Sequence, residues 1–289
     1  MAAAGPRFGE PDDRTPDPGL FGPGSATWEL HGDPIALVGG LRALLLQALH
    51  PQVMGGFVTR SDYRADPWGR LARTAEYVGT VAFGTTTEAR AAGDAVRRVH
   101  RRLGLDDPAL LMWVHASLVD SALQVHRRSG AGLPAERADE YVAEQVRAAT
   151  LVGLQPADVP RTATELAGYL AAVRPQLQAT PEAREAARFL LLPPMPARVR
   201  LLTPAAPAWT TLAATAFATL PGWAKRLYGG SLLGPALGGV TLPWSMIDEL
   251  PGTVAVRAVR ATLGALPPSW RVGPRQRAAL TRLGLPAAA

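Results

Sequence analysis

Apolar residues recur at helical spacing from Asp33 to about Pro221, and no segment alternates apolar and polar residues convincingly, as a half-buried strand would. Helix-start signals precede these segments, as at Asp66-Pro67 and Thr85. A glycine such as Gly104 stands where a helix should end. The chain is therefore expected to be all-α: a single globular multi-helix domain.

Proline and glycine usage suggests how the chain is organised. Residues 1–26 are rich in Pro, Gly and Asp and lack the apolar segment of a secretory signal, so they are expected to form a flexible tail. Residues 27–235 should form the helical domain, with short helices near its end because prolines interrupt them. Residues 236–289 should add a C-terminal helical segment, packed on the domain or appended to it. Within it, a helical hairpin is expected over about 253–266 and 273–283.

The composition limits the chemistry available to the chain. Hydrophobic residues make up 47% and charged residues 19% of 289 residues, which is enough to bury a sizeable core. There is no cysteine, which excludes disulfides, thiolate metal sites and iron–sulfur clusters. A metal or haem iron would therefore depend on one of five histidines or on a weaker ligand: His31, His50, His100, His115 and His126.

The positive charge does not indicate a nucleic-acid partner. The net charge is +6, nearly all of it from arginines that are spread along the chain and interleaved with acids. A membrane surface stays open as a peripheral partner. The longest apolar run, Ile35 to Leu49, contains two glycines and an arginine and is too short to span a bilayer. We therefore expect a cytoplasmic protein without a transmembrane segment.

A polar stripe stands out on the helix that follows Asp66-Pro67. Residues at i, i+3, i+4 and i+7 share one face of a helix. Here that face carries Arg70, Arg73, Thr74 and Tyr77, beside an apolar stripe that includes Leu71 and Val78. The next helix places His100 on an apolar face. A polar cluster facing an imidazole predicts a buried cofactor pocket.

Several short blocks resemble a known family and occur in its order. They are Leu49-His50-Pro51, residues 66–74, residues 96–100 and Trp113-Val114-His115-Ala116. Over about residues 28–221 the chain resembles the oxygenase family of the fungal MpaB protein and the bacterial latex clearing proteins (rubber oxygenases). The resemblance implies an all-helical fold that binds b-type haem through a proximal histidine. Rubber oxygenases use that haem to cleave carbon–carbon double bonds with dioxygen.

The resemblance also implies roles for particular residues. The family's Val-Arg-x-x-His helix matches Arg97 and His100, so His100 would be the axial ligand of the haem iron, with Arg97 beside the cofactor. The distal motif Arg-x-x-Lys-Thr reads here as Arg70, Arg73 and Thr74, which would be the catalytic residues on the dioxygen side. Arginine replaces the lysine, stays protonated and is a poor iron ligand. The sixth position would then hold water or another histidine, or stay open.

Other histidine and arginine roles remain open at this stage. His115 is a second candidate haem ligand or a hydrogen-bonded core residue. His50 is a candidate pocket residue, or it complements a helix dipole. His31 and His126 are expected to face solvent. Arg70 and Arg73 could also be ordinary surface charges.

The function expected from these observations is a haem-b-dependent oxygenase that uses dioxygen on an apolar, unsaturated small molecule. No glutamate matches the catalytic one of rubber oxygenases near residues 50–63, which argues against rubber as the substrate. The alternatives are a non-catalytic haem protein, such as a sensor or carrier, and a haem-free helical interaction protein. Nucleophile-elbow and Walker motifs are absent, which removes the hydrolase and kinase readings.

Overall fold

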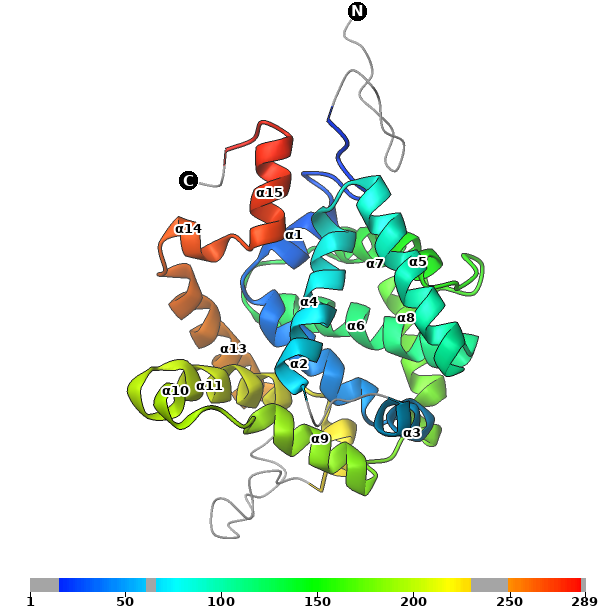
Figure 1. Ribbon diagram of the computed structural model, residues 1–289, viewed down its shortest axis with the longest axis vertical. Coiled ribbons are helices and arrows are strands. Elements are labelled where there is room, and N and C mark those ends of the chain that lie inside the picture. Colours follow the sequence, from blue (N-terminus) through cyan, green and yellow to red (C-terminus); the bar gives the residue numbers. More distant parts are fainter. Residues whose placement is uncertain (1–15, 61–65, 230–248, 287–289) are drawn as a thin grey trace, which may run out of the picture.

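The fold is all-α, as expected. The computed structural model describes residues 16–60, 66–229 and 249–286, and within these ranges it contains helices and no strand (Figure 1). The remaining parts of the expected tail and of the C-terminal segment lie outside the described residues. In chain order the helices are α1 (Ala26–Gly32), α2 (Ala36–Gln47), α3 (Pro51–Arg60), α4 (Pro67–Phe83), α5 (Thr86–Leu103), α6 (Pro108–Arg128), α7 (Ala135–Leu151), α8 (Ala163–Val173), α9 (Pro181–Leu191), α10 (Ala197–Leu202), α11 (Ala205–Ala218), α12 (Gly222–Leu227), α13 (Glu249–Gly264), α14 (Pro268–Arg271) and α15 (Pro274–Arg282).

The helix ends carry the caps that the sequence predicts. Thr85 and Glu88 form a capping box at the start of α5, each side chain accepting a hydrogen bond from the other residue's backbone N–H. Gly104 ends α5 with a φ of 58°, a left-handed conformation that glycine adopts without a Cβ clash. Asp66 and Asp107 cap α4 and α6, each followed by a proline. Local signals therefore predicted these ends correctly.

Three helices had no counterpart in the sequence-based expectations. They are α1, the short α14, and α3, which begins at Pro51. Proline at the first helical position loses no hydrogen bond, because the N–H there has no partner inside the helix. Pro51 therefore starts a new helix as well as ending the preceding one.

The core is built around α2, which lies along α6 and also packs against α11. Leu41, Leu45 and Trp113 belong to the main apolar cluster. A buried ion pair also lies in this region: Arg42 Nη1 is 2.8 Å from Asp120 Oδ2. Arg42 donates further hydrogen bonds to Ser121 Oγ and to the Thr219 carbonyl. The arginine that interrupts the apolar run thus has a carboxylate and two further hydrogen-bond acceptors inside the core.

The folded part begins earlier than expected. Leu20 and Phe21 are buried. Asp17 accepts hydrogen bonds from the backbone N–H and the hydroxyl of Thr86, which ties this segment to the start of α5. The expectation of a flexible tail up to residue 26 is therefore wrong for residues 16–26. Burial of Phe21 and the Asp17 hydrogen bonds hold the segment in place.

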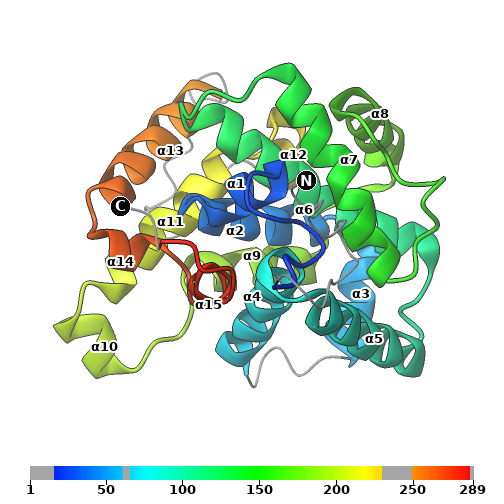
Figure 2. The ribbon, with the colours of Figure 1, turned by 90° about the horizontal axis from the view of Figure 1, so that it is seen from above.

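The C-terminal segment packs on the domain, but its helices do not lie mainly against each other. α13 contacts α11 and α6, whereas α15 contacts α4. The short α14 connects them along one side of the molecule (Figures 1 and 2). The expected hairpin is thus opened out, because α13 and α15 pack on different helices of the domain.

Candidate cofactor and substrate cavity

A cavity of about 630 Å³ lies inside the helical domain, within the size range of small-molecule sites. Helices α1 to α7 and α9 all contribute to its wall, which is mainly apolar. Among the described residues that line it there is no carboxylate and no lysine. Its cationic side chains are Arg70 and Arg73, and its histidines are His31, His100 and His115.

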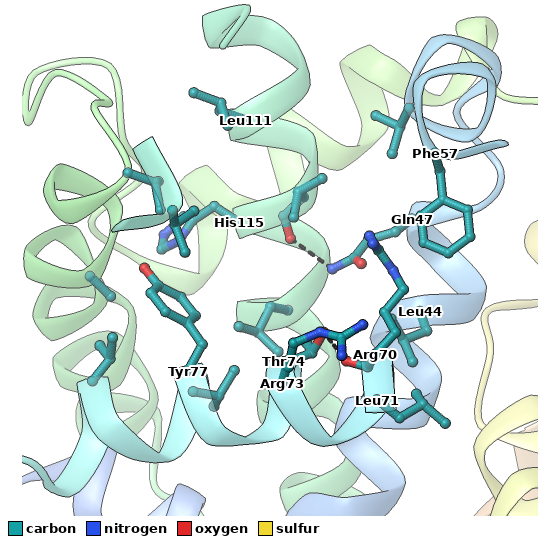
Figure 3. Close-up of a pocket in the computed structure, with 18 of the residues that line it drawn as sticks. Leu44, Gln47, Phe57, Arg70, Leu71, Arg73, Thr74, Tyr77, Leu111 and His115 are labelled. Atoms are coloured by element: carbon teal, nitrogen blue, oxygen red, sulfur yellow. Dashed lines mark hydrogen bonds between the residues drawn. The ribbon is translucent and has the colours of Figure 1, made fainter. Parts of the chain in front are cut away.

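The polar stripe predicted on α4 does line this cavity, together with its apolar neighbours Leu71 and Val78. Figure 3 shows Tyr77 pointing toward His115, with Arg70 at the other side of the view beside Gln47 and Phe57. The spacing of residues along one helix was enough to predict this wall.

Arg70 is held in the wall by an aromatic ring. Its guanidinium lies 4.1 Å from the centroid of the Phe57 ring, within the range of a cation–π interaction. Burial, and then the nearby charge of Arg73, lower the pKa of Arg70. Because no carboxylate lines the cavity, the half-buried charge of Arg70 creates a positive potential that favours an anionic group.

Arg73 and Thr74 are more exposed than the prediction of a buried distal site implies. The Arg73 side chain is 68% exposed and lies 3.1 Å from the Asp66 carboxylate. The Thr74 hydroxyl donates to the carbonyl of Arg70 at 3.1 Å, a common arrangement of threonine inside a helix. In this geometry the Thr74 oxygen can only accept a hydrogen bond from a ligand.

His100 lines the cavity from α5. Its Nδ1 is buried and has no hydrogen-bond partner in the described part of the chain. Burial, and then the charge of Arg70, lower the pKa of His100, while Asp106 acts in the opposite direction. A neutral imidazole with an unpartnered nitrogen is suited to binding a metal or haem iron.

Two further histidines share the cavity. Burial lowers the pKa of His115 to about 4, and it lowers the pKa of His31 to about 4 as well. His31 Nε2 lies 3.0 Å from the hydroxyl of Tyr141 on α7. The expectation that His31 faces solvent is therefore wrong. His31 belongs to α1, which packs against α4, α6 and α7 and so turns the side chain into the cavity.

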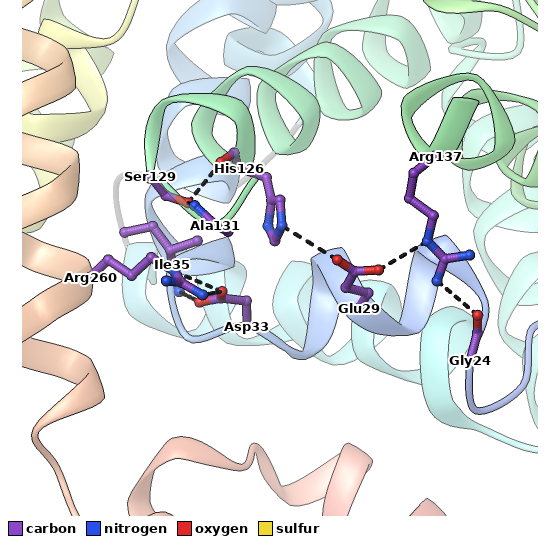
Figure 4. Close-up of polar contacts among 9 residues, drawn as sticks. All are labelled: Gly24, Glu29, Asp33, Ile35, His126, Ser129, Ala131, Arg137 and Arg260. Atoms are coloured by element: carbon purple, nitrogen blue, oxygen red, sulfur yellow. Dashed lines mark hydrogen bonds and ion pairs between the residues drawn. The ribbon is translucent and has the colours of Figure 1, made fainter. Parts of the chain in front are cut away.

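The expectation of a solvent-facing His126 is also wrong. His126 is 2% exposed, and its Nε2 lies 3.8 Å from the Glu29 carboxylate, which also pairs with Arg137 (Figure 4). Helix α1 again explains the burial, because it carries Glu29 and packs against α6. His126 does not line the cavity.

His50 and Arg97, both expected near the cofactor, do not line the cavity either. His50 is buried after α2, with its ring centroid 6.2 Å from that of Trp113. Arg97 lies on α5 beside Gly153, which follows α7. Neither residue is therefore placed to contact a ligand bound in the described part of the cavity.

Several polar residues of the site had no assigned role in the sequence analysis. Gln47 Nε2 donates to the carbonyl of Val114 at 3.1 Å and joins α2 to α6 at the cavity wall (Figure 3). Gln145 Nε2 donates to the Thr27 hydroxyl at 3.0 Å and joins α7 to α1. The inward position of Gln145 on its helix could have predicted its place in the wall. No sequence pattern predicted that α1 would contribute to the wall.

The described residues contain no group of three His, Asp or Glu side chains that could hold a metal ion by themselves. A haem iron makes a smaller demand, because one axial histidine is enough. Among these residues there is also no helix long and apolar enough to cross a membrane.

Comparison with known proteins decides the family. The family described as the ER-bound oxygenase mpaB/B′ and rubber oxygenase catalytic domain matches residues 28–261. The chain belongs to the MpaB/rubber oxygenase family. The match continues into α13, beyond the boundary expected at residue 235. No curated protein and no solved structure matches this chain significantly.

Proposed function

We propose that this MpaB/rubber oxygenase family member binds haem b and uses it with dioxygen to oxidise an apolar, unsaturated small molecule. The observation that carries the proposal is the cavity: a neutral His100 with an unpartnered nitrogen, two arginines and apolar walls without a carboxylate. Haem b needs one imidazole, cationic groups for its propionates and an apolar surround. The residues present fit that group.

Each lining residue would have a defined task. His100 would hold the iron, and the haem would supply dioxygen binding and activation. Arg70, half-buried over Phe57, would place a positive charge where negative charge develops during oxidation. Arg73, at the exposed edge and paired with Asp66, fits an auxiliary role toward a propionate or the entering substrate. Side chains such as Val78 and Leu111 would hold the apolar substrate and exclude water.

The decisive experiment is an absorption spectrum of the protein expressed with a supply of haem. A Soret band is expected, and His100→Ala should abolish or strongly weaken haem retention, since the iron loses its axial ligand. His126→Gln is the matched control, because His126 is also a buried histidine but lies outside the cavity. Full haem occupancy with an unchanged spectrum in His100→Ala would move the ligand elsewhere, first to His115.

A second measurement separates an oxygenase from a haem carrier or sensor. With a reductant and an apolar alkene present, the haem-loaded protein should consume dioxygen and form an oxidised product. Haem binding without dioxygen consumption would favour the carrier or sensor. No Soret band under any haem supply would leave the haem-free interaction protein.

A further inference from the structure

The inner part of the cavity, away from Arg70, contains an arrangement that haem binding does not use. Helices α1 and α7 are joined there by two hydrogen bonds, His31 to Tyr141 and Thr27 to Gln145, each of 3.0 Å. The residues on each helix are four apart, so the two bonds lie one helical turn from each other. His31, Thr27 and Gln145 all line the cavity.

This group lies far from the arginines. Trp28 of α1 packs edge-on against Phe83 at the end of α4, with ring centroids 5.3 Å apart. Arg70 is near the start of the same helix, and at 1.5 Å per residue about 20 Å of helix axis separates it from Phe83. One cavity therefore has a cationic end, formed by Arg70 and Arg73, and a second polar end, formed by Thr27, His31 and Gln145.

The side chains that line the second end are neutral. Burial lowers the pKa of His31 to about 4, so the imidazole carries no charge at neutral pH. Burial also raises the pKa of Tyr141 far above neutral pH, so it remains a phenol. The cavity lining contains no carboxylate among the described residues. Just outside the lining, the Glu144 carboxylate accepts a hydrogen bond from the Thr27 N–H at 2.8 Å, and its charge adds to the raised pKa of Tyr141. An anionic group would therefore find no counter-ion here, and its desolvation would be uncompensated.

Hydrogen-bonding capacity remains free at this end. His31 uses Nε2 toward Tyr141, and its Nδ1 has no hydrogen-bond partner in the described part of the chain. Gln145 uses Nε2 toward Thr27, and its Oε1 likewise has no partner among those residues. Nδ1 can donate or accept, depending on the tautomer, and Oε1 accepts. When the Tyr141 hydroxyl donates to Nε2, Nδ1 carries the proton, and a ligand hydroxyl can then accept from Nδ1 and donate to Oε1.

We infer that the neutral end formed by Thr27, His31 and Gln145 anchors a hydroxyl group of an otherwise apolar ligand, with Tyr141 orienting His31. This inference rests on the proposed function only where it treats the ligand as a substrate. The binding site itself is formed by the protein and does not require haem. It narrows the substrate class to elongated apolar molecules that carry an alcohol at the end remote from Arg70.

Calorimetric titration of the purified protein tests the inference with three small ligands, each used below its solubility limit. They are 1-octanol, its isomer 1-methoxyheptane, which lacks the O–H, and octanoate. His31→Leu removes the ring nitrogens and keeps an apolar side chain. Its Kd for octanol should rise about two- to tenfold more than its Kd for the ether, the usual effect of one lost hydrogen bond. Octanoate should be affected least, because its counter-ions are the arginines at the other end.

Two further variants keep the outcome interpretable. Tyr141→Phe removes only the hydroxyl that orients His31 and should raise the octanol Kd in the same direction by a smaller factor. It decides the question if His31→Leu does not fold. Leu118→Ala, a lining residue without polar atoms in its side chain, should weaken octanol and ether binding alike.

Equal changes for octanol and ether in both His31→Leu and Tyr141→Phe would overturn the hydroxyl anchor, as would wild-type protein that binds no octanol. These results are separable from the fate of the proposed function. Octanol binding that depends on His31 in a protein without a Soret band would refute only the haem proposal. Haem retention without any discrimination between the isomers would refute only the anchor.

Discussion

The two ends of the cavity are built in different ways. The cationic end comes largely from one helix, where Arg70 and Arg73 lie three residues apart on α4. The neutral end joins α1 and α7, and its hydrogen-bonded partners His31 and Tyr141 are 110 residues apart in the chain. Local helix geometry is enough to form the first end. The second exists only because two distant helices pack together, and it therefore tests the tertiary structure more severely.

The largest expected effect comes from the buried Arg42–Asp120 ion pair, which joins two helices of the cavity wall. Asp120→Ala would leave Arg42 buried without its carboxylate, and losing one partner of such a pair costs about 3–5 kcal/mol in the free energy of unfolding. Helices α2 and α6, which this pair joins, both line the cavity. Haem retention and octanol binding should therefore weaken together, which chemical denaturation and the two binding assays would show.

The double variant Arg42→Met, Asp120→Leu is the control for this ion pair, because apolar replacement of both partners often leaves the free energy of unfolding unchanged. It should recover most of the lost stability. Equal destabilisation in the single and double variants would mean that shape, rather than charge, dominates at this position.

The next effect should separate the ends. Arg70→Ala removes the half-buried positive charge and should lower turnover per bound haem by about two to three orders of magnitude. Octanol binding at the neutral end should change little, since the altered side chain is remote from it. Arg73→Ala, at an exposed residue paired with Asp66, should cost much less. Oxygen consumption normalised to haem content measures both turnovers, and calorimetric titration measures octanol binding.

The opposite result has a clear meaning. If Arg70→Ala loosens haem and leaves turnover per bound haem unchanged, Arg70 anchors a propionate and does not act on dioxygen. The distinction between the two ends would then remain, but the cationic end would be a cofactor clamp.

A smaller effect concerns the histidines of the cavity. The pKa of His31 and that of His115 are each about 4 in the folded protein, against 6.5 for an unperturbed histidine. Below pH 6.5 the unfolded chain therefore binds more protons than the folded one, and stability falls as the pH is lowered toward 4. Each histidine contributes at most about 1.4 kcal/mol per pH unit in this window.

Urea titrations between pH 7 and pH 5 would measure this slope. The double variant His31→Gln, His115→Gln should make it less steep. Arg70→Ala should reduce it only slightly, because the Arg70 charge is the smaller of the two causes that lower the pKa of His100. A slope that persists in the double variant would assign the acid sensitivity to His50, His100 or His126, whose pKa values burial also lowers.

Features that depend on one helix were predictable from the sequence, and features that depend on the packing of distant helices were not. The caps at Thr85 and Asp66, the left-handed Gly104 and the α4 stripe were predictable, because each depends on residues within one or two helical turns. His31 and His126 were misplaced, because α1 has no strong local signal and their burial depends on how that helix packs. The roles of His100 and Arg70 in haem chemistry remain predictions.

The sequence by itself determined the all-α class, most helix ends, the polar stripe of α4 and membership of an oxygenase family. These follow from short-range hydrogen bonding, from side-chain periodicity and from motifs a few residues long. Only the tertiary structure decided that His31, Thr27 and Gln145 meet in one cavity while His50 and Arg97 stay outside it. The physical reason is that burial and hydrogen bonding between helices depend on packing across more than a hundred residues, which no local pattern specifies.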